Sequence, residues 1–270
     1  MRRKALKLRP PIQNKNMRLF TLGTSHGAAE LHRACSMNLI EVSGKYYLFD
    51  CGGSAESRLV DMGIDPTLLR AVVISHMHED HIGSITGIVK RFTSYNPDKR
   101  NVRIFMPDAA SVDALRTWLS AINIFRWQDG KFLTEEAARL SFSPISEGVI
   151  FDDGNLRITA IPTRHLANGA MPSFAFVIEG EGRRVLYTAD LNPDFSDYPR
   201  IAYEKDFDLI LSELVHFDVA RNLPDIARSR TRKLVFTHYN ERSLRALRDA
   251  NAFFPFEVCV ANDGDEFNIV

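Results

Sequence analysis

The sequence predicts an α/β fold in which sheets pack together and helices cover them on the outside. Two observations support this fold class. Short apolar and β-branched runs, typical of strands, recur from Met17 to the C-terminus, and helical patterns occur both early and late in the chain. In 270 residues there is no Pro/Gly/Ser linker and no break in composition. We therefore expect one domain over residues 17–270, preceded by a basic tail, residues 1–16.

The first half of the chain is predicted to begin with three strands, two of them joined by a Ser43-Gly44 turn. A short helix follows and is stopped by glycine. The run 71–75 reads as a strand buried on both faces. Asp108 or Ser111 caps a further helix. In order we expect strands at 17–23, 37–42 and 45–50, a helix at 56–63, strands at 71–75 and 102–106, and helices at 108–122 and 133–140.

The second half is predicted to contain two hairpins, one turning at Asp153-Gly154 and the other at the sequence EGEG. Short buried strands then alternate with helices. The helical pattern near Pro224 is expected to be interrupted there. In order we expect hairpins at 148–162 and 173–190, a strand at 207–213, a helical segment at 216–229, a strand at 233–237, a helix at 241–254, and strands at 257–260 and 266–270.

Composition excludes several classes of protein. Lys+Arg and Asp+Glu are equal at 34 each, so no overall field favours nucleic acid or a membrane. Three cysteines, none in a Cys-x-x-Cys pair, indicate neither a disulfide framework nor a thiolate zinc finger. No apolar run approaches the ~18 residues of a membrane span, and no signal-peptide core follows the basic tail. The expected location is the cytoplasm. The tail is either a surface segment or an arm that touches a polyanion.

One short segment gathers metal-ligand residue types. His76, His78, Asp80 and His81 follow the strand at 71–75, and these three histidines are among only 8 in the chain. If the backbone leaves the strand extended, His76 and His78 point to the same side and can grip one cation. Asp80 and His81 can reach a second. Imidazole with carboxylate suits Zn²⁺, Mn²⁺ or Fe.

Three more donor residues follow apolar runs elsewhere in the chain. His165, Asp190 and His238 each lie just after a predicted strand. Ligand sites favour strand ends, because a rigid element aims the loop that follows it. Together with the cluster they would supply the remaining ligands of a metal centre.

The sequence contains, in this order, Asp50 in YYLFDCGG, the HMHEDH cluster, His165, Asp190 and His238. This ordered set of motifs resembles that of the metallo-β-lactamase-fold hydrolase superfamily. The resemblance implies a four-layer αββα sandwich of two similar halves. It implies one metal on His76, His78 and His165, and another on Asp80, His81 and His238, with Asp190 bridging both. It places Asp50 behind the ligands, where it orients the cluster loop.

The expected cofactors are two divalent metal ions, zinc first, with manganese or iron as alternatives. Two such cations lower the pKa of a shared water and hold it as a hydroxide that attacks phosphorus or a carbonyl carbon. Asp80 is expected to be essential for turnover. His216 and His26 are the first candidates for the group that protonates the leaving group, with a metal-bound water as the other source. Thr24 and Ser25 lie in a glycine-bounded loop that either approaches the substrate or simply turns. Glu79 is expected to face away.

Several stretches look most like the ribonuclease Z branch of that superfamily, but its long tRNA-gripping arm is missing: only 24 residues separate His165 from Asp190. We therefore expect no tRNA binding, and we interpret the basic run 228–233 as a solvated helix end. The leading hypothesis is a phosphodiesterase acting on a small or short nucleotide-like substrate. The alternatives are a hydrolase of a lactone, thioester or amide, and a non-catalytic metal-dependent sensor. No membrane partner is expected, and a homodimer is left open.

Overall fold

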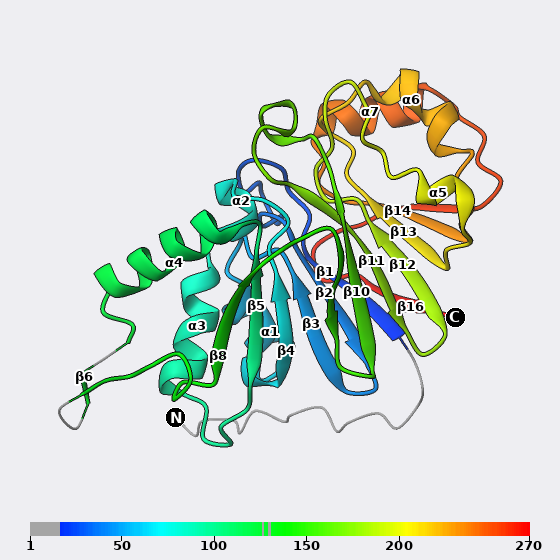
Figure 1. Ribbon diagram of the computed structural model, residues 1–270. Helices are drawn as coiled ribbons and strands as arrows, with labels where there is room; N and C mark the ends of the chain where they lie inside the picture. The colour runs from blue at the N-terminus through cyan, green and yellow to red at the C-terminus, as the bar shows by residue number, and fades with distance from the viewer. Residues whose placement is uncertain (1–16, 126, 129–130) are drawn as a thin grey trace.

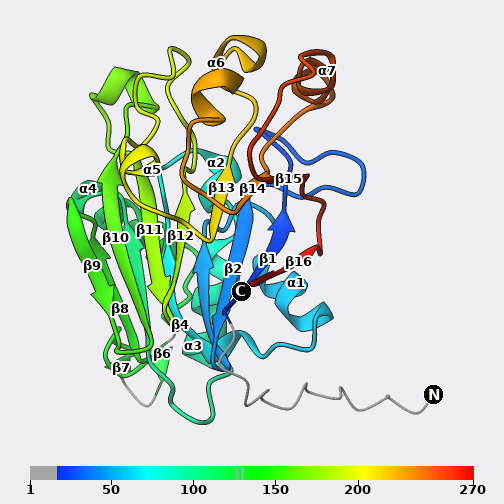
Figure 2. The ribbon, with the colours of Figure 1, turned by 90° about the vertical axis from the view of Figure 1, so that its right-hand side faces the viewer.

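The computed structural model describes residues 17–125, 127–128 and 131–270. Two seven-stranded sheets pack face to face, and helices cover the outer face of each (Figure 1). The view turned by 90° shows the two sheets side by side, with helices at the upper edge (Figure 2). This is the expected four-layer αββα sandwich. The basic tail lies outside the described residues.

The first sheet contains mostly N-terminal strands. In chain order they are β1 (Met17–Gly23), β2 (Met37–Val42), β3 (Lys45–Phe49), β4 (Leu69–Val73), β5 (Val102–Met106), β8 (Leu140–Pro144) and β16 (Glu266–Ile269). Their spatial order is β16-β1-β2-β3-β4-β5-β8, antiparallel up to β3 and parallel from β3 to β8. The central parallel strands β4 and β5 are apolar and buried except for one arginine each, as expected for strands covered on both faces.

The second sheet repeats this pattern with the later strands. In chain order they are β9 (Gly148–Asp152), β10 (Leu156–Pro162), β11 (Phe174–Gly180), β12 (Arg183–Tyr187), β13 (Leu209–Ser212), β14 (Lys233–Phe236) and β15 (Glu257–Val260). Antiparallel pairing joins β9 to β12, and parallel pairing continues from β12 to β15. A separate two-stranded sheet joins β6 (Trp127–Gln128) to β7 (Lys131–Phe132).

Most of the sequence-predicted helices are present. The helices on the first sheet are α1 (Ala55–Asp61), α2 (Glu79–Ile82), α3 (Ile85–Ser94) and α4 (Ala109–Ala121). The helices on the second sheet are α5 (Ile201–Glu204), α6 (Val219–Ile226) and α7 (Glu241–Asp249). Two short 3₁₀ helices are η1 (Pro66–Leu68) and η2 (Leu166–Gly169). The side chain of Asp108 caps α4 by accepting from Ser111 N.

One expected helix is absent, and the interruption expected in another is wrong. Residues 133–140 form a single turn rather than a helix, because strand β8 already begins at Leu140 and Arg139 takes a positive φ of 60°. Helix α6 continues through Pro224 to Ile226 rather than breaking there. Helix α7 also ends at Asp249, earlier than expected. Helix α3 was not anticipated from the sequence.

The sandwich is held together by three apolar layers. One lies between the first sheet and its helices, one between the second sheet and its helices, and one between the two sheets. In the middle layer, Phe49 of β3 meets Phe176 of β11 at 5.8 Å between ring centroids, and Tyr187 of β12 stacks on Phe176 at 6.4 Å. Burial of this apolar surface fixes how the two sheets align.

The sheets hold the candidate site at one edge. Helices α2, α6 and α7 lie along the upper edge in Figure 1, where they follow β4, β13 and β14. The loops at this edge carry all of the predicted metal ligands. Among the described residues, no helix is long and apolar enough to cross a membrane.

Replacing Phe176 with alanine is expected to lower the free energy of unfolding by about 3–5 kcal/mol, because it leaves a cavity between the sheets. Urea denaturation measures the change. Phe253→Ala is the matched control: that ring is 83% exposed, so its loss should change stability by less than about 0.5 kcal/mol. Equal losses for the two variants would contradict the central role of this layer.

Candidate metal centre

Four loops bring the seven predicted metal ligands together. The loop after β4 carries His76 and His78, and α2 carries Asp80 and His81. The other three ligands come from the loops that follow β10, β12 and β14; they are His165, Asp190 and His238.

The first set of ligand atoms has the spacing of a tetrahedral site. His76 Nε2 lies 3.1 Å from His78 Nδ1, which lies 3.3 Å from His165 Nε2. Asp190 Oδ2 lies 3.6 Å from both His76 Nε2 and His165 Nε2. With metal–ligand bonds of about 2.0–2.1 Å, tetrahedral ligand atoms lie about 3.3–3.4 Å apart. These residues therefore fit one zinc-sized cation.

The second set has similar spacing. His81 Nε2 lies 3.7 Å from Asp80 Oδ2, and His238 Nε2 lies 3.8 Å from the same oxygen. Both rings also lie 3.3 Å from Asp190 Oδ2. Asp190 Oδ2 thus belongs to both sets, the arrangement expected of a bridging carboxylate.

Buried polar atoms without partners mark the same place. Among the described residues, His81 Nε2 and Asp190 Oδ1 are buried and have no hydrogen-bond partner. A buried polar atom without a partner is costly. His81 Nε2 belongs to the second ligand set, where a bound cation would give it a partner, and Asp190 Oδ1 belongs to the carboxylate that both sets share. Glu79 of the cluster is exposed and belongs to neither set, as expected.

Burial and neighbouring charges shift the pKa values of several side chains in the site. Burial and the neighbouring His81 lower the pKa of His76 well below its usual value. Burial would raise the pKa of Asp190, but His238 and His81 hold it well below its ordinary range, so the carboxylate is ionised. Burial would lower the pKa of His81, but Asp190 and Asp50 raise it well above the usual value. A cation displaces that proton, because histidine ligates in its neutral form.

Asp50 holds the cluster loop from behind. The fully buried carboxylate accepts from Ser75 N at 2.8 Å and from Ser75 Oγ at 3.0 Å. His81 Nδ1 lies 2.9 Å from Asp50 Oδ2, and the Tyr187 hydroxyl donates to that oxygen at 2.6 Å. Burial and the charge of Asp50 raise the pKa of Tyr187 well above its usual value, so the phenol remains a donor. Asp50 therefore orients His81 without touching the metal positions.

Two other ligand rings are oriented in the same way. His76 Nδ1 lies 3.0 Å from Ser75 Oγ, and His165 Nδ1 lies 3.0 Å from the backbone oxygen of Leu191. Each contact occupies the ring nitrogen that does not face the cation. The tautomer and the direction of each ring are thereby set before any metal binds.

Sharp backbone bends aim these side chains. Asp50, Ala189 and His238 have φ values of 61°, 48° and 48°, each within two residues of a strand end. Such conformations cost about 1–3 kcal/mol each and cluster at functional sites. Gly52 packs against the cluster, since a Cβ there would lie 1.6 Å from the backbone oxygen of Asp80. Only glycine allows this approach.

His216, one of the two expected proton donors, lies on the open side of the site. Its Nδ1 lies 3.6 Å from Asp190 Oδ2 and 3.0 Å from Glu213 Oε2. Burial would lower the pKa of His216, but the Glu213 and Asp190 carboxylates raise it to about 9. The side chain is 28% exposed. Among the described residues, its Nε2 has no hydrogen-bond partner.

Glu213 was missed in the sequence. Its carboxylate is buried and accepts from Leu191 N at 2.7 Å, Val215 N at 2.9 Å and His216 N at 2.8 Å. It thus joins the loop of the bridging Asp190 to the loop of His216. The sequence did offer a signal for this role, because Glu213 ends the predicted buried strand 207–213. A carboxylate at such a position is buried only if hydrogen-bond donors surround it.

The glycine-bounded loop touches the site through the backbone of Gly27 and the ring of His26, whose centroid lies 6.5 Å from that of His238. Gly27 N donates to Asp80 Oδ2 at 2.7 Å. Thr24 and Ser25 are fully buried, and their hydroxyls bond to Asp263 and to Ala28 O. Of the two alternatives for these residues, their burial and internal hydrogen bonds favour the simple turn. His26, the other expected donor, has its Nε2 3.3 Å from Asn240 Nδ2.

The segment between His165 and Asp190 contains η2 and the β11–β12 hairpin. The basic run 228–233 follows α6 and ends at Lys233, the first residue of β14, whereas His238 follows that strand. Its cations pair with acids; the pairs are Arg228–Asp225, Arg230–Asp206, Arg232–Asp208 and Lys233–Glu257.

Sequence comparisons identify relatives. Residues 17–256 match the family of the anti-Pycsar protein Apyc1. A ribonuclease Z of Mycolicibacterium paratuberculosis is 25% identical over 186 residues, 64% of this chain and 62% of the relative. A ribonuclease BN of Escherichia coli is 29% identical over 162 residues, 55% of this chain and 46% of the relative. The chain thus spans about half to three fifths of these curated relatives.

A solved structure shares the fold. The metallo-β-lactamase fold protein YhfI from Bacillus subtilis matches with a TM-score of 0.72 and 20% identity, over 94% of this chain and 99% of that chain. The four-layer sandwich and the resemblance to this fold, both expected from the sequence, are confirmed.

Replacing Asp50 with asparagine is expected to weaken zinc binding by about 10–100-fold, because an amide cannot accept from Ser75, Tyr187 and His81 at once. Competition with a chromogenic chelator measures the affinity, and circular dichroism checks that the variant folds. Asp152→Asn, which changes an exposed hairpin carboxylate, is the control and should bind as the wild type does. Unaltered affinity in Asp50→Asn would refute the role of this carboxylate.

Proposed function

This chain belongs to the family of the anti-Pycsar protein Apyc1, and we propose that it is a phosphodiesterase that holds two divalent cations and hydrolyses a small or nucleotide-like substrate. The observation that carries the proposal is the pair of ligand sets that share Asp190 Oδ2. Zinc is the first candidate for both positions, with manganese or iron as alternatives.

Two cations at these positions would lower the pKa of a water toward neutrality and offset the negative charge that develops on a phosphoryl group. The chain's own contribution is placement. Asp190 Oδ2 sets the separation of the two positions, and Asp50 and Ser75 keep the rings of His81 and His76 from rotating. The reacting group is thus held against fixed charges, which need no reorganisation during the reaction.

His216 is proposed to protonate the leaving oxygen. Glu213 accepts from His216 Nδ1, so the partner-free Nε2 is the atom from which a proton leaves toward the substrate. The ring lies 4.6 Å from that of His165 and 5.5 Å from that of His238, between centroids, so it borders both ligand sets. His26 does not border both ligand sets in this way.

The proposal of a phosphodiester substrate rests on the names of the relatives, and its small size rests on the β11–β12 hairpin and the basic run 228–233. Two relatives are named ribonucleases, and the bonds in RNA are phosphodiesters. A small substrate is favoured because the β11–β12 hairpin stands where an arm would extend, and because the basic run is paired with acids. The same ligands also suit carbonyl substrates, so the test must include one.

We expect the zinc-loaded protein to hydrolyse thymidine 5′-(p-nitrophenyl phosphate), to lose this activity with EDTA, and to regain it when zinc is restored. Absorbance of p-nitrophenolate follows the reaction. The lactone dihydrocoumarin is tested in parallel. Hydrolysis of the lactone alone would move the assignment to carbonyl chemistry. Turnover of neither, with metal bound, would indicate a binding protein.

Asp80→Ala is expected to lower kcat by more than about a hundredfold, since it removes a ligand of the second set. Metal content is measured beside the rate. Asp98→Ala, which alters an exposed carboxylate paired with Arg100, is the control and should keep the wild-type rate. A full rate in Asp80→Ala would contradict the two-cation proposal.

Replacing His216 with glutamine is expected to slow hydrolysis of the thymidine 5′-phenyl phosphate ester by about a hundredfold, because phenolate needs a proton to leave. The p-nitrophenyl ester has a better leaving group and should be slowed less. Comparing kcat for both esters measures this difference. His26→Gln should not change the ratio of the two rates. If His216→Gln slowed both esters equally, its role would be structural.

A further inference from the structure

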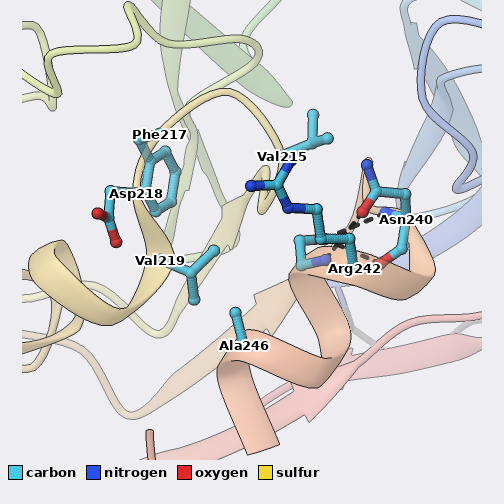
Figure 3. A pocket seen from close by; sticks show the side chains of 8 residues that line it. Val215, Phe217, Asp218, Val219, Asn240, Arg242 and Ala246 are labelled. Carbon is cyan, nitrogen blue, oxygen red and sulfur yellow. Dashed lines mark hydrogen bonds between the residues drawn. The ribbon is translucent and has the colours of Figure 1, made fainter. Parts of the chain in front are cut away.

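A pocket of about 380 Å³ opens between α6 and α7 (Figure 3). Its floor is apolar, formed by Val215, Phe217, Val219 and Ala246. Phe217 is buried and packs against Phe195 at 4.7 Å between ring centroids. The volume lies within the range of small-molecule sites.

The residues that line this pocket come from the loop that carries His216, from the segment after β14 that carries His238, and from α6 and α7. Val215 and Phe217 flank His216 in the sequence, and Asn240 lies two residues after the ligand His238. Asn240 Nδ2 also lies 3.3 Å from His26 Nε2, at the rim of the site. The residues that line the pocket are thus chain neighbours of His216 and of the ligand His238.

One cation in the pocket lacks an acidic partner. In Figure 3 the guanidinium of Arg242 reaches from α7 toward the loop of Val215. Along the same helix, Arg245 and Arg248 both approach Glu241, whereas Arg242 pairs with no acid among the described residues. Asp218, the acid at the rim, caps α6 by accepting from Arg221 N and lies beyond Phe217 in Figure 3.

We propose that this pocket holds the base of a nucleotide substrate, and that Arg242 is a specificity-determining residue which recognises it. The proposal rests on the proposed phosphodiesterase function. A base is planar and largely apolar on its faces, which suits the floor of Phe217, Val219 and Ala246. Its ring nitrogens and carbonyl oxygens accept hydrogen bonds, and a guanidinium supplies several donors in one plane.

The apolar floor distinguishes a base from a bare anion. A phosphate or sulfate would use the charge of Arg242 but would leave Val219 and Phe217 without a contact. The guanidinium plane can also lie on a base ring, as arginine does in single-stranded RNA recognition. Arg242→Lys separates the two cases, because lysine keeps the charge and loses the planar set of donors.

The experiment compares two diesters with the same leaving group in the zinc-loaded protein: thymidine 5′-(p-nitrophenyl phosphate) and methyl p-nitrophenyl phosphate. In Arg242→Ala, kcat/KM for the thymidine ester should fall by about tenfold, mainly through KM, while that for the methyl ester stays unchanged. Arg242→Lys should behave like Arg242→Ala. Arg245→Ala, three residues further along the same helix, is the control and should leave kcat/KM for both esters unchanged.

Equal effects of Arg242→Ala on the two esters, or no effect, would overturn the pocket assignment and leave the phosphodiesterase proposal intact. If the wild type hydrolyses neither ester, the proposed function fails, and calorimetry decides the pocket separately. Binding of thymidine 5′-monophosphate should then weaken about tenfold in Arg242→Ala, while inorganic phosphate binding stays the same. Equal weakening of both would identify a plain anion site and refute base recognition.

Discussion

The buried carboxylate of Asp50 is the contact on which the rest of the metal centre depends. It accepts from Ser75 in the first half of the sandwich and from Tyr187 of β12 in the second, so one anion ties the two sheets together at the edge that carries the site. A charge without solvent is tolerated only when donors surround it. Because the same oxygen orients His81, sheet packing and ligand placement are set by one group.

The ligands could be predicted because each follows a strand, and a strand is read from its apolar run. Glu213 could not be assigned, since its role depends on backbone donors from two loops far apart in sequence. Helix α3 was missed because its β-branched residues and Gly87 have low helix propensity; its buried face, not its propensity, stabilises it. Residues 133–140 show the opposite effect. They include good helix formers, but strand β8 begins at Leu140 and its pairing prevents a helix there.

Chemistry and specificity lie in different parts of this molecule. The ligand sets, Asp50 and Glu213 sit on strand ends and are held by buried hydrogen bonds, which explains why one fold serves many hydrolytic reactions. In our proposal, the rest of a substrate meets α7 and the loop leading into α6. Among the described residues, Arg242 of α7 pairs with no acid, and Phe217 packs against Phe195. On this proposal the metal ligands determine the class of reaction, and the pocket selects the substrate.

The central claim is that seven residues hold two cations joined by one oxygen of Asp190. Anomalous diffraction at the zinc edge, from crystals of the zinc-loaded protein, tests it most directly. The claim predicts two peaks about 3.5–4 Å apart, one beside His76, His78 and His165 and the other beside Asp80, His81 and His238, with Asp190 Oδ2 between them. A single peak, or two peaks that do not share Asp190, would contradict it.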